Sequence, residues 1–224
     1  MPPMEISSLN KLPPHTPLSN DKQLLNGDWE FVGYEDVEEI PWPQLFDGQM
    51  PRTMPVPANW ELHGFGSPRY INTRYTFEPD ANLLHPPYIP AGQNPVGLYT
   101  RTFNHQAQAG FRDILAFNGF EGALFVYLNH QFVGYASNGR SVSEFDITEL
   151  VHSGENQLHL VLAAFSAGSW LECQDMWRLK GINRDVYLTQ VPERRIFDHY
   201  THFDLDRSRL HIDAKILNDT PVLS

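Results

Sequence analysis

The chain has 224 residues, of which 41% are hydrophobic, and its 16 Lys and Arg against 27 Asp and Glu give a formal net charge of -11 at pH 7. This length is sufficient for one principal domain with a complete core. Because the balance is acidic and no basic run occurs, nucleic acid and anionic membranes are excluded as partners. The single cysteine excludes an internal disulfide, and no apolar segment reaches the ~18 to 20 residues of a membrane-spanning helix.

The N-terminal stretch, residues 1–25, is rich in Pro, Ser and Asn. It lacks the basic start and the apolar stretch of a secretory signal, which favours a soluble protein in the reducing cytoplasm. Pro13, Pro14 and Pro17 block regular structure. We therefore interpret this stretch as an N-terminal arm, either extended or disordered, with no core of its own.

Short segments in which apolar and polar residues alternate follow the arm, and this period is typical of half-buried strands. We expect the first strand to start at Trp29 and another to cover residues 97–104. Two apolar segments, 123–128 and 132–135, meet across Asn129, and Asn can adopt the left-handed conformation that a tight hairpin requires. The sequence therefore predicts antiparallel strands joined by short turns.

Residues 143–150 indicate a short turn capped by Asp146, and further strands are expected at 157–164 and 185–189. Many short strands with hardly any helical periodicity are typical of a two-sheet β-sandwich or jelly roll. We therefore predict an all-β fold in which residues 26–192 form a jelly-roll β-sandwich.

Two more alternating segments, 200–205 and 210–217, lie near the end of the chain. An isolated two-stranded hairpin is marginal in water. We therefore predict that residues 193–224 begin a second β-sandwich domain that the chain does not complete.

The residues from Trp170 to Arg178 combine indoles, carboxylates, an amide and a guanidinium in one short run. An indole packs on the apolar face of a pyranose while carboxylate and amide groups hydrogen-bond its hydroxyls, so this composition is typical of a sugar site. The same residues also suit a core Trp beside a surface ion pair. Composition alone leaves both interpretations open.

Hydrolysis of a glycosidic bond commonly needs two carboxylates, and the sequence offers Glu144 with Asp146, and Glu172 with Asp175. Asp146 is better explained as a turn cap. Glu172 and Asp175 share a face only on a helical turn, so we expect one of them to bind ligand rather than both to form a catalytic pair. No histidine spacing or cysteine set fits a transition metal, whereas the Asp175 carboxylate suits a hard cation. We expect Cys173 to be a buried, inert thiol.

Several motifs follow one another along the chain in a fixed order. They are Leu25-Asn26-Gly27-Asp28-Trp29, Val56-Pro57-Ala58-Asn59-Trp60-Glu61-Leu62-His63-Gly64, Tyr70-Ile71-Asn72-Thr73-Arg74-Tyr75, Asn94-Pro95-Val96-Gly97-Leu98-Tyr99, Ser143-Glu144-Phe145-Asp146, Gln174-Asp175-Met176-Trp177-Arg178 and Gly181-Ile182-Asn183-Arg184-Asp185-Val186. Through them the chain resembles the N-terminal sugar-binding domain of glycoside hydrolase family 2 β-galactosidases, and the similarity runs through most of its length.

The resemblance implies a galactose-binding-like jelly roll whose loops reach into the active site of a later catalytic barrel, followed by an immunoglobulin-like β domain. In such enzymes the residue matched by Asn72 contacts the galactosyl group. The residue matched by Asp175 contacts the same sugar and ligates a sodium ion near its 6-hydroxyl. We expect Trp177 to pack behind these two residues and fix the loop. The catalytic glutamates lie in the barrel, together with magnesium, so the resemblance implies no catalytic residue in this chain. It also implies a homo-oligomer.

Two positions depart from the family pattern, since Cys173 stands where an acidic residue is usual and Asn183 where an aromatic residue is usual. We therefore expect different packing and charge near the site. The leading hypothesis is the N-terminal part of a retaining β-galactosidase, which binds substrate and sodium and leaves the chemistry to later residues. The alternatives are a stand-alone carbohydrate-binding jelly roll and a piece whose Pro-rich arm serves oligomer contacts.

Overall fold

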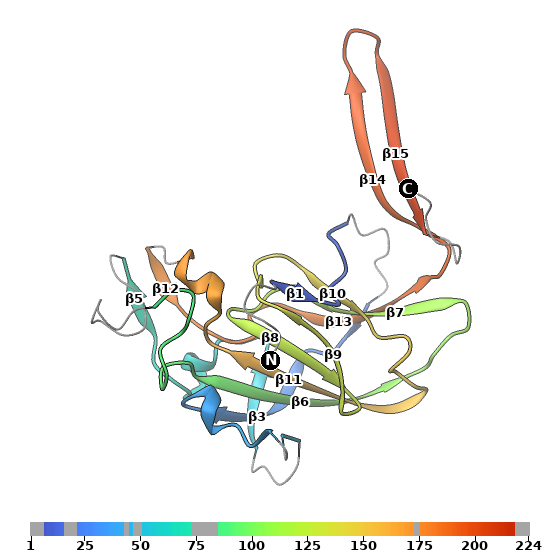
Figure 1. The fold of residues 1–224 in the computed structure, drawn as a ribbon. Coiled ribbons are helices and arrows are strands. Elements are labelled where there is room, and N and C mark those ends of the chain that lie inside the picture. Colours follow the sequence, from blue (N-terminus) through green and yellow to red (C-terminus); the bar gives the residue numbers. More distant parts are fainter. Residues whose placement is uncertain are drawn as a thin grey trace.

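The computed structural model describes residues 7–15, 22–42, 45–46, 51–72, 85–172 and 175–217. Within these ranges the chain forms β-strands and short 3-10 turns, and two antiparallel sheets make up a sandwich (Figure 1). The predicted all-β jelly-roll sandwich is confirmed. In this described part of the chain, no helix is long and apolar enough to cross a membrane.

The larger sheet contains seven strands. Their order is β1 (Ser8–Leu9), β9 (Gln131–Ala136), β8 (Ala123–Leu128), β11 (Gly154–Ala163), β6 (Val96–His105), β3 (Gly27–Tyr34) and β4 (Arg52–Val56). The central pair is the longest, since β11 and β6 run from Gly154 opposite His105 to Ala163 opposite Val96. This pair forms the middle of the sheet on which the core is built.

The smaller sheet contains four strands. Their order is β10 (Ser143–Asp146), β7 (Phe111–Phe117), β13 (Val186–Pro192) and β2 (Gln23–Leu24). Two further pairs stand apart from both sheets, the ribbon of β5 (Arg69–Ile71) with β12 (Met176–Arg178) and the hairpin of β14 (Arg195–Asp204) with β15 (Arg209–Leu217). The described connections include the 3-10 turns η1 (Val37–Glu39), η3 (Trp60–His63) and η5 (Ala167–Trp170).

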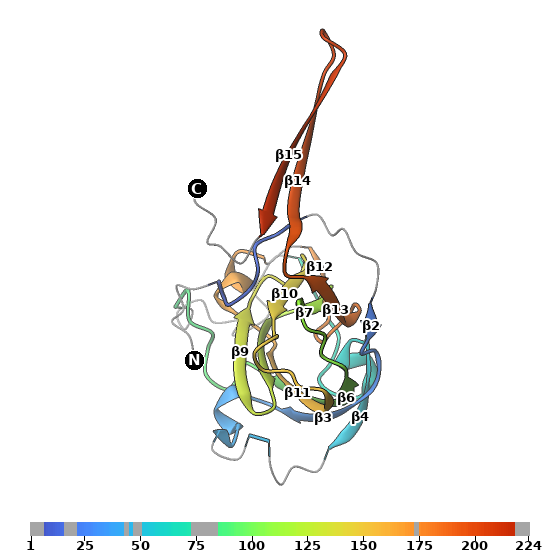
Figure 2. The same ribbon diagram turned by 90° about the vertical axis from the view of Figure 1, so that its right-hand side faces the viewer.

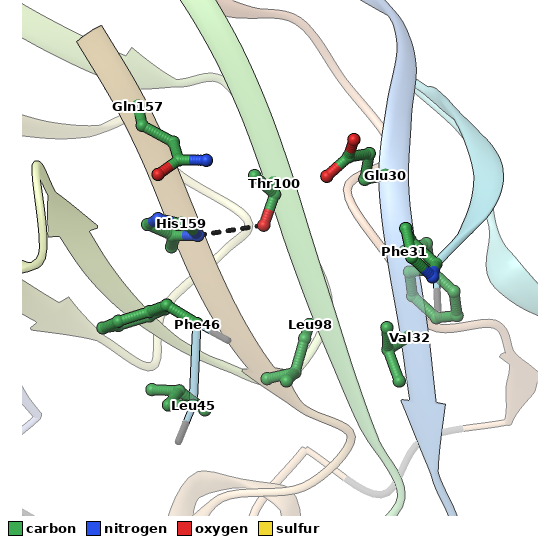
Figure 3. A pocket seen from close by; sticks show the side chains of 10 residues that line it. Glu30, Phe31, Val32, Leu45, Phe46, Leu98, Thr100, Gln157 and His159 are labelled. Atoms are coloured by element: carbon green, nitrogen blue, oxygen red, sulfur yellow. Dashed lines mark hydrogen bonds between the residues drawn. The ribbon is translucent and has the colours of Figure 1, made fainter. Parts of the chain in front are cut away.

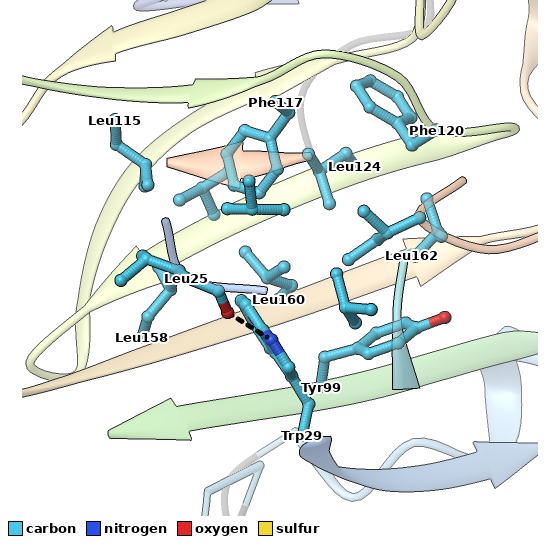
Figure 4. Close-up of a cluster of buried hydrophobic side chains, with 14 of the residues drawn as sticks. Leu25, Trp29, Tyr99, Leu115, Phe117, Phe120, Leu124, Leu158, Leu160 and Leu162 are labelled. Carbon is cyan, nitrogen blue, oxygen red and sulfur yellow. Dashed lines mark hydrogen bonds between the residues drawn. The ribbon is translucent and has the colours of Figure 1, made fainter. Parts of the chain in front are cut away.

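The main core lies between the two sheets (Figure 4). Trp29 of β3 and Tyr99 of β6 are each 1% exposed, and their rings meet edge to face with centroids 6.3 Å apart. A buried indole nitrogen needs a hydrogen-bond partner, and Trp29 Nε1 donates to the Leu25 carbonyl at 2.9 Å. Leu25 is itself 2% exposed, so the core reaches the last residue of the predicted arm.

The tight hairpin between β8 and β9 is confirmed. Asn129 and His130 have φ angles of 50° and 64°. Positive φ at both central residues defines a two-residue type I′ turn, whose twist matches that of the flanking strands. The Asn129 side chain also accepts the Gln157 N–H at 3.0 Å and thereby ties the turn to β11.

Other strand boundaries differ from the predictions. β3 begins at Gly27 instead of Trp29, and residues 143–146 form strand β10 before the turn begins. The predicted cap is confirmed, since Asp146 Oδ1 accepts the Thr148 N–H at 3.1 Å. The short strands β1 and β2 were not predicted, because two residues that pair with distant strands leave no periodic pattern in the sequence.

The β14–β15 hairpin projects away from the sandwich (Figures 1 and 2). Large apolar side chains are exposed along it, namely Tyr200, Phe203, Leu205, Leu210 and Ile212. At its base Phe197 is 5% exposed, and its ring stacks on His15 of the arm with centroids 4.4 Å apart. The second domain remains a prediction, for which this hairpin supplies two strands.

Candidate functional site

The β5–β12 ribbon brings together the two predicted binding residues. Its register pairs Met176 with Ile71 and Trp177 with Tyr70. Asn72 directly follows Ile71 and Asp175 directly precedes Met176, so both residues leave the ribbon at its Ile71–Met176 pair. Two positions separated by more than a hundred residues in the sequence therefore lie at the same end of one ribbon.

The two faces of the ribbon carry different chemistry. Because side chains alternate along a strand and opposite residues share a face, Tyr70, Asn72, Asp175 and Trp177 belong to one face. The contact between Tyr70 and Trp177, with ring centroids 5.7 Å apart, agrees with this assignment. This face combines an amide, a carboxylate and two aromatic rings.

A hydrogen bond fixes the carboxylate of this face, since the Tyr70 hydroxyl donates to Asp175 Oδ1. The bond raises the pKa of Tyr70 above its ordinary value, because it stabilises the protonated phenol. Tyr70 is 51% exposed and Trp177 is 58% exposed. Both rings can therefore offer a surface to a bound ligand.

The two indoles of the run from Trp170 to Arg178 differ in exposure. Trp170 ends η5 and is 7% exposed, so the core interpretation holds for this indole. Trp177 was expected to pack behind Asn72 and Asp175. That expectation is wrong, because Trp177 lies on the same face of the ribbon as they do and is largely exposed.

The carboxylates proposed as catalytic pairs have other partners. Glu144 Oε2 lies 3.3 Å from His15 Nδ1, and Asp146 Oδ2 lies 2.8 Å from Arg112 Nη2. Asp175 directly precedes strand β12, in which the backbone is extended. Ion pairing and capping account for Glu144 and Asp146 without catalysis.

Metal ligation was predicted for Asp175 alone. Among the described residues, no group of three or more His, Cys, Asp or Glu side chains converges on a possible metal position. Cys173 lies outside the described residues.

A small pocket on the larger sheet is not a suitable sugar site (Figure 3). It has a volume of about 130 Å³ and is lined by Phe46, Thr100 and His159, among others. Thr100 Oγ1 lies 2.9 Å from His159 Nδ1 in its wall. Small-molecule sites usually measure about 300 to 1,000 Å³. The ribbon therefore remains the better candidate.

A β-sandwich that presents aromatic, amide and carboxylate groups on one ribbon has the features of a carbohydrate-binding module. The chain belongs to glycosyl hydrolases family 2, and residues 22–192 match the sugar binding domain of that family.

Two relatives are β-galactosidases. The chain is 37% identical over 193 residues to the β-galactosidase of Actinobacillus pleuropneumoniae, which covers 86% of the chain and 18% of that protein. It is 36% identical over 230 residues to the β-galactosidase of Oenococcus oeni, which covers 94% of the chain and 22% of that protein. The chain therefore spans about a fifth of the length of these relatives.

The fold is also found in solved structures. A β-glucuronidase from an uncultured Clostridium species superposes with a TM-score of 0.62 at 18% identity, covering 93% of this chain and 36% of that one. A β-glucuronidase from Faecalibacterium prausnitzii gives a TM-score of 0.61 at 19% identity, covering 93% and 37%. At 18% and 19% identity, these similarities show a common fold only.

Sequence reasoning missed the role of Tyr70. The signal was present, since Tyr70 and Asn72 are two residues apart and therefore share a face of any strand. What the sequence lacked was the register that sets this face beside Asp175.

Proposed function

We propose that this chain is the substrate-positioning N-terminal part of a β-galactosidase that hydrolyses terminal non-reducing β-D-galactose residues. The observation that supports the proposal is the β5–β12 ribbon, whose Met176–Ile71 pair lies directly next to Asp175 and Asn72 in the sequence. The identity of 36–37% to β-galactosidases over most of the chain supports the choice of sugar.

In the proposed role, Asn72 and Asp175 hydrogen-bond hydroxyls of the galactosyl group. An amide both donates and accepts, whereas a carboxylate only accepts, so together they fit a polyol. Tyr70 positions the Asp175 carboxylate through its hydroxyl. The exposed indole of Trp177 can pack on the C–H face of a pyranose.

Sodium fits the donors on this face. Hard cations take carboxylate and carbonyl oxygens, and Asp175 supplies a carboxylate while Asn72 supplies a carbonyl. Sodium bound there would hold the sugar's hydroxyl oxygens by charge. In the proposal Asp175 is the metal ligand of this chain, and further oxygens come from elsewhere in the protein.

The chemistry itself is assigned to residues outside this chain. A retaining double displacement needs two carboxylates about 5 to 5.5 Å apart, and the carboxylates of one candidate pair, Glu144 and Asp146, have His15 and Arg112 as ion-pair partners. We place the catalytic glutamates and a magnesium ion in a later barrel. The 224-residue chain should then lack activity by itself. A cytoplasmic location and a homo-oligomeric complete enzyme belong to the same proposal.

The test is Asp175→Ala in the full-length enzyme, with Asp206→Ala as the matched control because Asp206 is exposed in the turn between β14 and β15. Loss of a hydrogen bond to a charged group costs about 1.5 to 3 kcal/mol, so kcat/KM for a galactoside should fall about 10- to 100-fold. The response to sodium should also disappear. Unchanged turnover and an unchanged sodium response in Asp175→Ala would sink the proposal.

A further inference from the structure

The β5–β12 ribbon has three residues in each strand and is separate from both sheets of the sandwich (Figure 1). A two-stranded pair is marginal in water without further support. The proposed sugar contacts nevertheless need a defined direction for Asp175, which directly precedes β12. The ribbon therefore needs support at its other end, where Arg69 pairs with Arg178. We call this end the base.

The 3-10 turn η3 and Asn59, which precedes it, support the base. Lys180 follows β12 by two residues, and its carbonyl accepts the Trp60 N–H at 3.0 Å and Asn59 Nδ2 at 3.2 Å. The backbone N–H of Lys180 donates to both carboxylate oxygens of Glu61, at 2.9 Å each. Residues 59–61 therefore bind both main-chain polar groups of Lys180.

The residues beside this contact lie equally close together. The Ala58 N–H donates to the Ile182 carbonyl at 2.7 Å. Gly181 has a φ angle of 115°, and a Cβ added there would lie 2.6 Å from the Ala58 carbonyl oxygen. Glycine is the residue that permits both this φ angle and so close an approach of two backbones. The segment after β12 is thus held along residues 180–182.

The same turn leads into the other strand of the ribbon, since η3 ends at His63 and β5 starts at Arg69. The Phe65 N–H donates to the Trp60 carbonyl at 3.0 Å, and the two rings meet with centroids 5.2 Å apart. Trp60 is 2% exposed. The turn that binds the segment after β12 therefore also fixes the segment before β5.

Glu61 is the half-buried carboxylate of this network. Its Oε1 also accepts Trp60 Nε1 at 2.8 Å. Burial raises the pKa of Glu61. Burial of a carboxylate is unfavourable unless hydrogen bonds compensate it, and here backbone and indole donors do so. The proposed function gives Glu61 no contact with sugar or sodium, whereas its hydrogen bonds fix the base of the ribbon.

We propose that Glu61 and Asn59 are positioning residues of the candidate sugar site, which hold the base of the ribbon and thereby the direction of the Asp175 carboxylate. The inference rests on the proposed function, because these residues affect turnover only through Asp175. Neither of them contacts the sugar.

The test is a double-mutant cycle in the full-length protein, with kcat/KM for 4-nitrophenyl β-D-galactoside as the readout. Glu61→Ala should lower kcat/KM about tenfold in the parent and less than about twofold in Asp175→Ala, because residues that act through one interaction are not additive. Glu61→Gln keeps one accepting oxygen and should recover most of the loss. An equal fold loss in both backgrounds would overturn the proposal.

Asp146→Ala is the matched control. Asp146 is also a half-buried carboxylate that accepts a backbone N–H, from Thr148 at 3.1 Å, but it belongs to β10 of the smaller sheet. Its loss should reduce stability and leave kcat/KM within about twofold of the parent. If Glu61→Ala does not fold, Asn59→Ala gives the same cycle with a smaller loss. A loss of equal size with and without the Asp175 carboxylate then contradicts the proposal.

The titration of Tyr70 separates this proposal from the galactoside assignment, because it involves no sugar. The hydrogen bond to Asp175 raises the pKa of Tyr70. Glu61→Ala should lower this pKa towards its value in Asp175→Ala, whereas Asp146→Ala should leave it unchanged. A Tyr70 titration identical to the parent in Glu61→Ala contradicts the positioning role. A lowered pKa, together with unchanged turnover in Asp175→Ala, would support the positioning of Asp175 and overturn the galactoside assignment alone.

Discussion

Asp175 and Tyr70 act as one unit at the end of the ribbon. In the proposed site the Asp175 carboxylate must be held in a defined direction. The Tyr70 hydroxyl holds it by donating a hydrogen bond to Asp175 Oδ1. Both side chains are near solvent, so the strength of this contact depends on geometry more than on burial.

We expect Asp175→Ala to lower the pKa of Tyr70 towards its ordinary value. The hydrogen bond to Asp175 is the main cause of the raised pKa, followed by partial desolvation and by the negative charge of Asp175. The pKa of Tyr70 can be followed by NMR of ring-labelled tyrosine, with Tyr70→Phe to assign the signal. An unaltered Tyr70 titration in Asp175→Ala means that the contact is absent in solution.

Lys180 should make stability depend on pH. Its pKa is lowered from 10.5 to about 8, chiefly by burial, with Glu121 acting in the opposite direction. The unfolded chain therefore binds more protons than the folded one between these two values, and stability rises with pH in that window. Below pH 8 the buried ammonium is fully charged, and its burial then lowers the free energy of unfolding by the full amount.

Lys180→Met removes this cost. The variant should therefore gain more stability over the parent at pH 7 than at pH 10, where stability is the free energy of unfolding. At 1.36 kcal/mol per pKa unit, the gain should differ between the two pH values by an amount on the order of a few kcal/mol. Urea denaturation of both proteins at the two pH values measures it. A difference that does not change with pH would show that Lys180 titrates at its ordinary value.

At the scale of elements, the N-terminal arm is an edge strand of the sandwich. β1 pairs with β9, Asn10 Nδ2 donates to the Val133 carbonyl at 2.8 Å, and the Leu12 N–H donates to the Glu144 carbonyl at 2.8 Å. The arm therefore touches the edges of both sheets. Within the arm, residues 7–15 follow these edges.

Close packing of the arm depends on Gly134. A Cβ added at Gly134 would lie 2.6 Å from the Leu9 carbonyl oxygen and 2.7 Å from the Phe145 ring. Gly134→Ala should therefore displace β1, at a cost of about 1 to 3 kcal/mol for overpacking.

Faster hydrogen exchange at Leu9 and Leu12, and faster proteolysis of the arm, are the expected readouts for Gly134→Ala. Gly168→Ala is the matched control, since a Cβ there would meet nothing closer than 3.4 Å. If hydrogen exchange and proteolysis of the arm are no faster in Gly134→Ala than in Gly168→Ala, the packing of the arm does not depend on Gly134.

Sequence patterns predicted the elements that depend on local chemistry. Alternation located the strands that cover residues 97–104, 123–128 and 157–164, and Asn129 located the hairpin turn. The same reasoning could not find β1 or β2. Each has two residues, and each exists only because a distant strand offers it an edge.

The family resemblance, and not the strand pattern, named Asn72 and Asp175 as binding residues, and their roles stay predictions. The register of β5 with β12 adds that both lie at the same end of one ribbon. The environment of Trp177 was predicted wrongly because an indole suits either a core or an exposed ribbon. Only tertiary pairing distinguishes these two.

At the scale of the whole molecule, the β14–β15 hairpin stands apart from the two sheets of the sandwich. It carries exposed large apolar side chains, among them Tyr200, Phe203 and Leu210. The chain spans about a fifth of its β-galactosidase relatives. Together these observations support the proposal that the sandwich is one part of a longer protein.

Substrate preference of the full-length protein tests the proposed galactoside site most directly. Two relatives by sequence are β-galactosidases, and two solved structures of similar fold and lower identity are β-glucuronidases, so kcat/KM should be compared for 4-nitrophenyl β-D-galactoside and 4-nitrophenyl β-D-glucuronide. We expect a clear preference for the galactoside, and loss of that preference in Asn72→Ala and Asp175→Ala. Preference for the glucuronide, or an undiminished galactoside preference in both variants, would contradict it.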